Sequence, residues 1–146
     1  MPVNTSAVGK QYAPVVYAVG REKVKEYASA VGETNPLHLD PAAARAAGYD
    51  DVVAPPMFAV VYSMHALAPA MFDPEVGMNF ATMVHGGQTF EWDEPACSGD
   101  EITTTAKCIS IDEKLGNGFY VFETTSVNGA GAEVVRGTWT NIVRGV

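Results

Sequence analysis

Three features are scarce in this 146-residue chain, and each scarcity narrows what the protein can be. The only two cysteines, Cys97 and Cys108, lack the close pairing of a metal or redox motif, so we expect two reduced thiols in or near strands. Basic residues number nine against 17 acidic ones, which gives a net charge of −8. That charge argues against sequence-independent attraction to nucleic acid or to an anionic membrane.

Long apolar runs are also missing. No run reaches the ~18 residues that a membrane-spanning helix needs. The first residues, MPVNTSAVGKQYAP, lack the basic and apolar regions of a secretory signal. We therefore expect a cytoplasmic protein with no membrane partner. The length suits one domain, residues 1–146, that can bury an ordinary core.

Patterns typical of cofactor sites are absent too. The three histidines show no metal-ligand spacing with cysteines or carboxylates, and no glycine-rich loop joins a strand to a helix in the dinucleotide manner. Ser63 does not lie in a nucleophile elbow, so covalent catalysis has little support. We expect neither a metal nor a cofactor.

The first third of the chain alternates short elements with turns. A short extended piece is expected at 15–19, and from Gly20 the apolar residues recur at helical spacing, with Gly32 placed to end that helix. A second, short helix has clear boundaries: Asp40 as N-cap, Pro41 at the first position and Gly48 after the last.

A third segment, residues 57–68, is apolar on almost every side. It follows the pair Pro55-Pro56, and Pro69 is expected to end it. Such a helix should be buried on nearly every side, with His65 as a hydrogen-bonded core histidine.

After Pro74 the apolar period changes from helical to two, which predicts strands. The expected strands are residues 79–84, 86–93, 101–112, 119–128 and 133–144, separated by glycine-rich turns. His85, between the first two, is expected to have a structural role at a strand bend. Helices followed by hairpin-linked strands predict an α+β domain whose antiparallel sheet curls around the apolar helix.

The most informative stretch is YASAVGETNPLHLDP, residues 27–41. It places a carboxylate, an amide and an imidazole, from Glu33, Asn35 and His38, within six residues of loop. Adding or removing water beside a thioester carbonyl needs a base, an acid and a group that holds the departing oxygen. Ordinary turn chemistry of the Asn-Pro pair is the alternative interpretation of these residues.

This stretch resembles the signature of MaoC-like (R)-specific enoyl-thioester hydratases and dehydratases. The resemblance extends over roughly residues 15 to 143, including the segment HGGQTFEW at 85–92, and is strongest to HadA-type (3R)-hydroxyacyl-ACP dehydratase subunits. It implies a single hot-dog fold and reversible hydration of trans-2-enoyl thioesters of CoA or ACP in fatty-acid metabolism. It also implies Glu33, His38 and Asn35 as catalytic residues, and a homodimer or a heterodimer with a second hot-dog subunit.

Two positions depart from that signature. The family's catalytic Asp is Glu33 here, one methylene longer. The glycine whose backbone N–H stabilises the thioester oxygen in active members aligns with Pro56, which has no N–H. The amides of Met57 and Phe58, at a helix start, are the candidate replacements. The alternative is therefore a non-catalytic acyl-binding subunit whose partner carries the Asp/His site.

Overall fold

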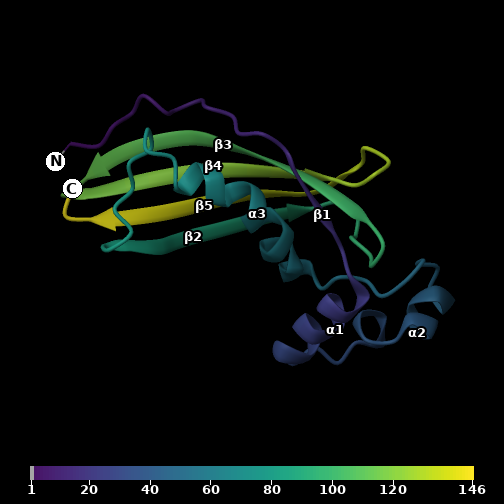
Figure 1. The fold of residues 1–146 in the computed structure, drawn as a ribbon. Helices are drawn as coiled ribbons and strands as arrows, with labels where there is room; N and C mark the ends of the chain where they lie inside the picture. The colour runs from purple at the N-terminus through teal and green to yellow at the C-terminus, as the bar shows by residue number, and fades with distance from the viewer. Residues whose placement is uncertain (1) are drawn as a thin grey trace.

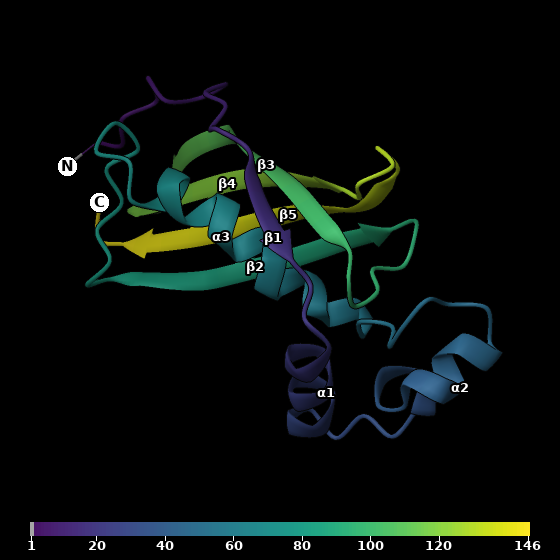
Figure 2. The same ribbon diagram turned by 45° about the vertical axis from the view of Figure 1, so that its right-hand side comes forward.

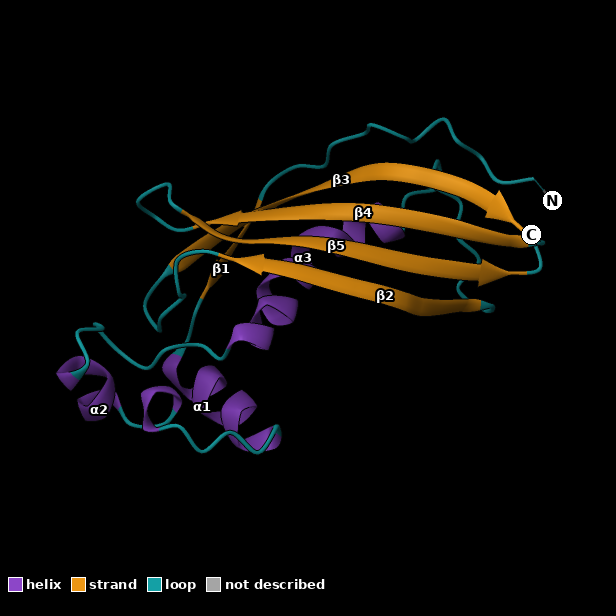
Figure 3. Ribbon diagram, turned by 180° about the vertical axis from the view of Figure 1, so that it is seen from behind, coloured by secondary structure: helices purple, strands orange, loops and turns teal. Residues whose placement is uncertain are grey.

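A five-stranded antiparallel sheet, curved around one helix, is the main body of the computed structural model, which describes residues 2–146. The strands are β1 (Val15–Ala18), β2 (Met83–Trp92), β3 (Glu101–Lys114), β4 (Asn117–Val127) and β5 (Glu133–Arg144). Their spatial order is β1-β3-β4-β5-β2, so that β2 and β1 form the two edges (Figure 3). This confirms the predicted α+β class and the hot-dog arrangement.

Three helices precede the long strands: α1 (Arg21–Ala30), α2 (Pro41–Ala46) and α3 (Ala59–Met71). Two 3-10 turns, η1 (Pro36–His38) and η2 (Pro56–Phe58), connect them. Figures 1 and 2 show α3 against the sheet, while α1 and α2 lie beyond the end of the sheet at which α3 begins. No helix within residues 2–146 meets the length and hydropathy needed to cross a membrane.

The local boundaries follow the sequence signals. Asp40 caps α2 through its side chain, which accepts a hydrogen bond from the Ala42 amide at 2.9 Å. Gly32 follows α1 with a φ of 74°, a conformation that glycine adopts without strain. The predicted hairpins between β3 and β4 and between β4 and β5 are present.

The concave face of the sheet and α3 share the core. One cluster surrounds Trp139, Phe122 and Leu67 near the C-terminal part of α3, and another surrounds Phe58 and Ile102 near its start. Both cysteines are buried free thiols, as expected. Each cluster packs against a different part of α3, so the helix is positioned along its whole length.

Pro69 does not end the third helix, contrary to the prediction. It lies inside α3, which continues to Met71. A proline in a helix removes one backbone hydrogen bond and crowds the preceding turn. Pro69 is exposed, whereas Leu67 and Ala70 beside it are fully buried. Packing of these neighbours holds the helical conformation through the proline.

The expectation that this helix is covered on nearly every side was also wrong. Met64 and His65 lie on an exposed side of α3, and 37% of the Met64 surface is accessible. His65 stacks on Tyr17 with ring centroids 5.3 Å apart and is not a buried, hydrogen-bonded core histidine. The sheet of one chain covers only part of the helix circumference, which periodicity alone does not reveal.

The two strands expected at 79–84 and 86–93 form one strand, β2. Residues 79–82 instead make a turn, in which the Asn79 side chain accepts a hydrogen bond from the Ala81 amide. The register shifts between His85 and Gly87, and His85 Nε2 hydrogen-bonds to the Gly87 carbonyl at 2.9 Å. A bulge absorbs the extra residue without breaking the strand, so the structural role expected for His85 is confirmed.

Candidate active site

The loop after α1 uses one polar atom of each signature residue for its own conformation. Glu33 Oε1 accepts hydrogen bonds from the amides of Thr34 and Asn35, at 3.2 and 3.3 Å. Asn35 Oδ1 accepts from the Leu37 amide at 3.0 Å and so caps η1. The turn chemistry considered above is therefore real. Within residues 2–146, Glu33 Oε2 and Asn35 Nδ2 have no hydrogen-bond partner and remain available.

His38 ends η1 and is 8% exposed. Its Nδ1 lies 2.6 Å from the carbonyl oxygen of Val53. A carbonyl can only accept, so Nδ1 carries the hydrogen and Nε2 of the neutral ring is left as an acceptor. The Val53 amide in turn donates to the Leu37 carbonyl at 2.8 Å. This reciprocal pairing with the chain before α3 fixes both the tautomer and the orientation of the imidazole.

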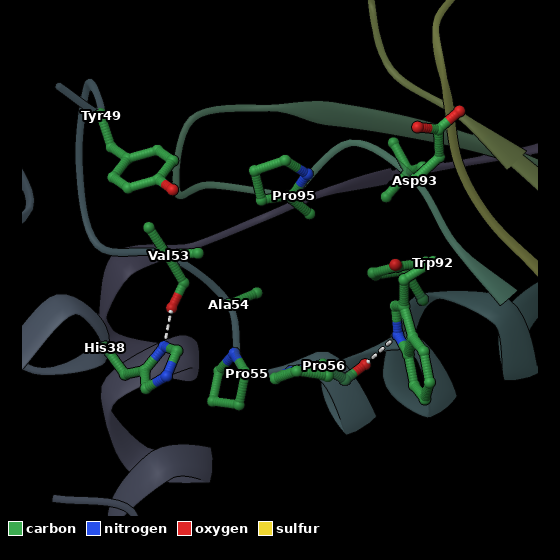
Figure 4. Close-up of a pocket in the computed structure, with 12 residues that line it drawn as sticks. His38, Tyr49, Val53, Ala54, Pro55, Pro56, Trp92, Asp93 and Pro95 are labelled. Carbon is green, nitrogen blue, oxygen red and sulfur yellow. Dashed lines mark hydrogen bonds between the residues drawn. The ribbon is translucent and has the colours of Figure 1, made fainter. Parts of the chain in front are cut away.

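His38 lines a cavity of about 400 Å³. Most of the wall is apolar, and four other lining residues carry polar side-chain atoms: Tyr49, Tyr62, Trp92 and Asp93. Figure 4 shows Pro55 and Pro56 between His38 and Trp92, with Tyr49 and Pro95 across from them. A mostly apolar hollow with a few polar groups is typical of a site for a small organic ligand.

Glu33 lines a second cavity, of about 390 Å³, together with Tyr27, Val31 and Met57. Pro55 and Pro56 contribute to the walls of both cavities. Within residues 2–146 no side-chain-to-side-chain hydrogen bond joins Glu33, Asn35 and His38, although the Asn35 amide donates to Glu33 Oε1. The structure thus brings the three residues into one loop. Glu33 and His38 lie on the walls of two cavities that share Pro55 and Pro56, here called the diproline turn.

The diproline turn leaves few amides for a thioester oxygen. Pro56 has no N–H, and the Phe58 amide donates to the Pro55 carbonyl at 2.9 Å. The Met57 amide has no acceptor among residues 2–146. On the other side of the turn, Trp92 Nε1 donates to the Pro56 carbonyl at 2.8 Å and holds the turn against the end of β2 (Figure 4).

Sequence reasoning did not select the cavity residues Tyr49, Tyr62, Trp92 and Asp93. Trp92 and Asp93 lie at the end of β2, about 55 residues from His38 along the chain, and strand order β5-β2 at the sheet edge brings them near it. The available signal was the hydroxyl of Tyr62, one of three polar side chains, with Ser63 and His65, within a mostly apolar helix. Burial raises the pKa of the Tyr62 hydroxyl, so this group stays protonated at neutral pH.

The fold and this site define the class: a MaoC-like hot-dog dehydratase. The chain belongs to the family described as FAS1-like, dehydratase domain region, whose model matches residues 6–136. A UPF0336 protein of Clavibacter michiganensis is 44% identical over 99% of this chain and 98% of its own length. Another, from Saccharopolyspora erythraea, is 40% identical over 99% of this chain and 94% of that protein.

Two solved structures share this architecture at more than 25% identity. A MaoC-like dehydratase superposes with a TM-score of 0.85 and 33% identity over 95% of this chain, which spans only 42% of that longer chain. A chain of the C-terminally truncated HadBC (3R-hydroxyacyl-ACP dehydratase) complex of Mycobacterium tuberculosis gives a TM-score of 0.83 and 27% identity, covering 96% of this chain and 99% of that one. The (R)-hydratase PhaJ1 of Pseudomonas aeruginosa, at 21% identity and a TM-score of 0.72 over 95% of this chain and 83% of that one, shows the fold alone.

Proposed function

We propose that this chain takes part in the reversible hydration of trans-2-enoyl thioesters to (3R)-hydroxyacyl thioesters, carried on CoA or ACP. The observation that carries the proposal is His38. It is buried at the wall of a mostly apolar cavity, and its Nδ1 is bonded to Val53 so that Nε2 is the free proton acceptor. Membership in a dehydratase family supports the same reaction type.

The chemistry assigns complementary tasks. In the dehydration direction, a base takes a proton from C2, the C3–O bond breaks, and the departing hydroxyl receives a proton and leaves as water. His38 Nε2 fits one of the two proton transfers, and Glu33 Oε2 is proposed for the other. Asn35 Nδ2 would hold the water or the hydroxyl. Each of these atoms is the one that the local hydrogen bonds leave unused.

A second candidate function is an acyl-binding subunit without a complete catalytic site of its own. It is favoured by Glu33 and His38 lining separate cavities and by the absent N–H of Pro56. The similarity to a chain of the HadBC complex supports a heterodimer with a second hot-dog subunit that supplies the catalytic pair. A homodimer remains the arrangement expected if the chain acts alone.

The deciding experiment measures hydration of crotonyl-CoA and crotonyl-ACP by the purified chain, followed as loss of the enoyl absorbance. A hydro-lyase turns over by itself, and His38→Ala lowers that rate by about 10²–10⁴-fold, the usual contribution of a proton-transferring side chain. His85→Ala is the matched control. His85 stacks on Trp139 at the bulge, so its loss should affect stability more than the rate per folded molecule.

Three outcomes separate the candidates. Turnover that needs His38 supports the hydro-lyase. Thioester binding without turnover, with activity restored only by an added hot-dog partner, supports the binding subunit. Turnover unchanged in His38→Ala would remove His38 from the mechanism.

A further inference from the structure

Tyr62 is a buried tyrosine of α3. Only 2% of its surface is accessible, and it lines the His38 cavity from α3. Within residues 2–146 no hydrogen bond involves the hydroxyl. It is not one of the polar atoms sealed away from all solvent, as Oγ of the adjacent Ser63 is. The hydroxyl is therefore accessible to a molecule of the size of water, and Tyr62 lines the cavity that His38 also lines. A hydroxyl without a protein partner there can bond to water or to a ligand that enters the cavity.

The same cavity is short of donors for a carbonyl oxygen. Pro56 has none, and the Phe58 amide is already bonded to Pro55. Met57, whose amide has no acceptor among residues 2–146, lines the Glu33 cavity instead. Tyr62 lies six residues after Pro56 along the chain, and both residues contribute to the wall of the cavity. A tyrosine hydroxyl is protonated at neutral pH, and burial raises the pKa of Tyr62 further, so this hydroxyl can donate.

Tyr49 also reaches this cavity, and its hydroxyl points into it in Figure 4. Tyr49 is partly exposed, however, so water competes for its hydroxyl. Tyr62 is covered by the packing of Phe58 and the surrounding core cluster. A donor held in an apolar, water-poor wall interacts more strongly with a ligand oxygen than one exposed to solvent.

We propose that the Tyr62 hydroxyl donates a hydrogen bond to the thioester carbonyl oxygen of an acyl ligand bound beside His38. This inference rests on the proposed function and names the group that replaces the N–H absent at Pro56. The carbonyl oxygen gains negative charge when C2 loses its proton, so the bond strengthens in the transition state. In a binding subunit the same bond would orient the thioester without turnover.

A pair of ligands that differ only at the carbonyl tests this bond. Butyryl-CoA carries the thioester oxygen, and S-butyl-CoA is the thioether that lacks it. Both are titrated calorimetrically against the wild-type chain and Tyr62→Phe. The variant should bind butyryl-CoA about tenfold more weakly, as expected for loss of one buried hydrogen bond, and S-butyl-CoA as the wild type does. Where the chain turns over crotonyl-CoA, kcat should fall by more than KM rises.

Tyr120→Phe is the matched control. Tyr120 is 3% exposed, has no hydrogen-bond partner among residues 2–146, and belongs to the other core cluster. The Tyr120→Phe substitution removes the same hydroxyl from an equally buried site away from His38. It should leave the affinities for butyryl-CoA and S-butyl-CoA unchanged. Thermal unfolding of both variants reports any general loss of structure.

Two kinds of result would contradict these proposals. Unchanged butyryl-CoA affinity and turnover in Tyr62→Phe, or an equal loss for both ligands, would refute the hydrogen bond while leaving the proposed function intact. Failure of the wild-type chain to bind or turn over any thioester would refute the proposed function, and this inference with it.

Discussion

At the scale of single residues, the loop after α1 serves two purposes with the same side chains. Glu33, Asn35 and His38 each commit one polar atom to a backbone group and keep the other free. The committed bonds restrict side-chain rotation before any ligand arrives, which lowers the entropic cost of ordering a site. Turn formation and chemistry are therefore compatible here, and local hydrogen bonding does not argue against a catalytic role.

Glu33 is the residue at which these two purposes can be separated. Glu33→Gln keeps an oxygen that can accept from Thr34 and Asn35, so the loop should persist, but it cannot transfer a proton. In a catalytic chain we expect the crotonyl-CoA hydration rate to fall by about 10²–10⁴-fold. Glu33→Asp restores the family's residue and should preserve or raise the rate. A full rate in Glu33→Gln would show that the carboxylate transfers no proton and would favour the binding subunit.

At the scale of elements, the sequence predicted most boundaries because they depend on local chemistry. Asp40 and Gly32 act within a few residues of their own positions, and the turns after β3 and β4 do so too. The errors arose where distant contacts decide. Leu67 and Ala70 carry α3 through Pro69, and pairing with β5 keeps β2 continuous through its bulge.

In the candidate site, too, only the residues identified by local sequence could be predicted. Signature residues close in sequence, such as His38, could be identified from the chain alone. Trp92 and Asp93 could not, because they reach the cavity only through the placement of β2 at the sheet edge. Tyr62 could not be assigned to the cavity from the sequence, because the sequence does not show which side of α3 faces it.

Pro69 offers a direct test of how tertiary packing overrides helix propensity. Pro69→Ala restores a backbone N–H inside α3 and removes the ring's crowding of the preceding turn. We expect the free energy of unfolding to rise by up to about 3 kcal/mol, measured by urea denaturation. Pro41→Ala is the control, because Pro41 lies at the first position of α2, where proline is tolerated. Equal responses from the two variants would show that Pro69 carries no helix-breaking cost here.

At the scale of the whole molecule, a polar cluster ties the N-terminal arm to the loop after α3. Lys10 Nζ lies 2.7 Å from Asp73 Oδ2 and 2.9 Å from Glu75 Oε2, and the Tyr12 hydroxyl donates to Asp73 at 2.7 Å. The arm also pairs with β3, since the Tyr12 amide donates to the Ala106 carbonyl. Asp73 thus joins segments that are about 60 residues apart.

This cluster predicts a loss of stability in acid. Hydrogen bonds from Lys10 and then Tyr12 lower the pKa of Asp73 from 3.8 to about 2. A carboxylate with a lowered folded-state pKa stabilises the fold above its unfolded pKa, and this contribution disappears as the pH falls from about 4 towards 2. Asp73→Asn should therefore be less stable than wild type above about pH 4, with the difference shrinking in that window. Denaturant unfolding at several pH values measures it, with the exposed Asp112→Asn as control. A difference that does not vary with pH would contradict the assignment.

Exposed apolar side chains and an open sheet edge mark a surface on which a second chain is predicted to dock. Large apolar residues lie exposed along α3, in the turns at its two ends and on β2: Met57, Met64, Phe72, Phe80, Val84 and Trp92. Phe72 and Phe80 stack on each other with centroids 4.7 Å apart, and 69% of Phe72 is accessible. β2 pairs with β5 on one side only. Unpaired edges and large apolar patches mark association surfaces.

Met64→Lys places a charge in the centre of this exposed side of α3 and tests whether a second chain covers it. We expect the wild type to elute at twice the 15.5 kDa chain mass in light-scattering chromatography, and the variant to elute as a monomer with its circular dichroism unchanged. Burying an unpaired ammonium in an apolar interface is strongly unfavourable, whereas the same side chain is solvated in the monomer. Leu115→Lys, at a fully exposed hairpin tip, adds the same charge and should not change the mass.

A wild type that is monomeric alone but doubles its mass with a second hot-dog chain would identify the partner as heterologous. A dimer that survives Met64→Lys would place the interface elsewhere.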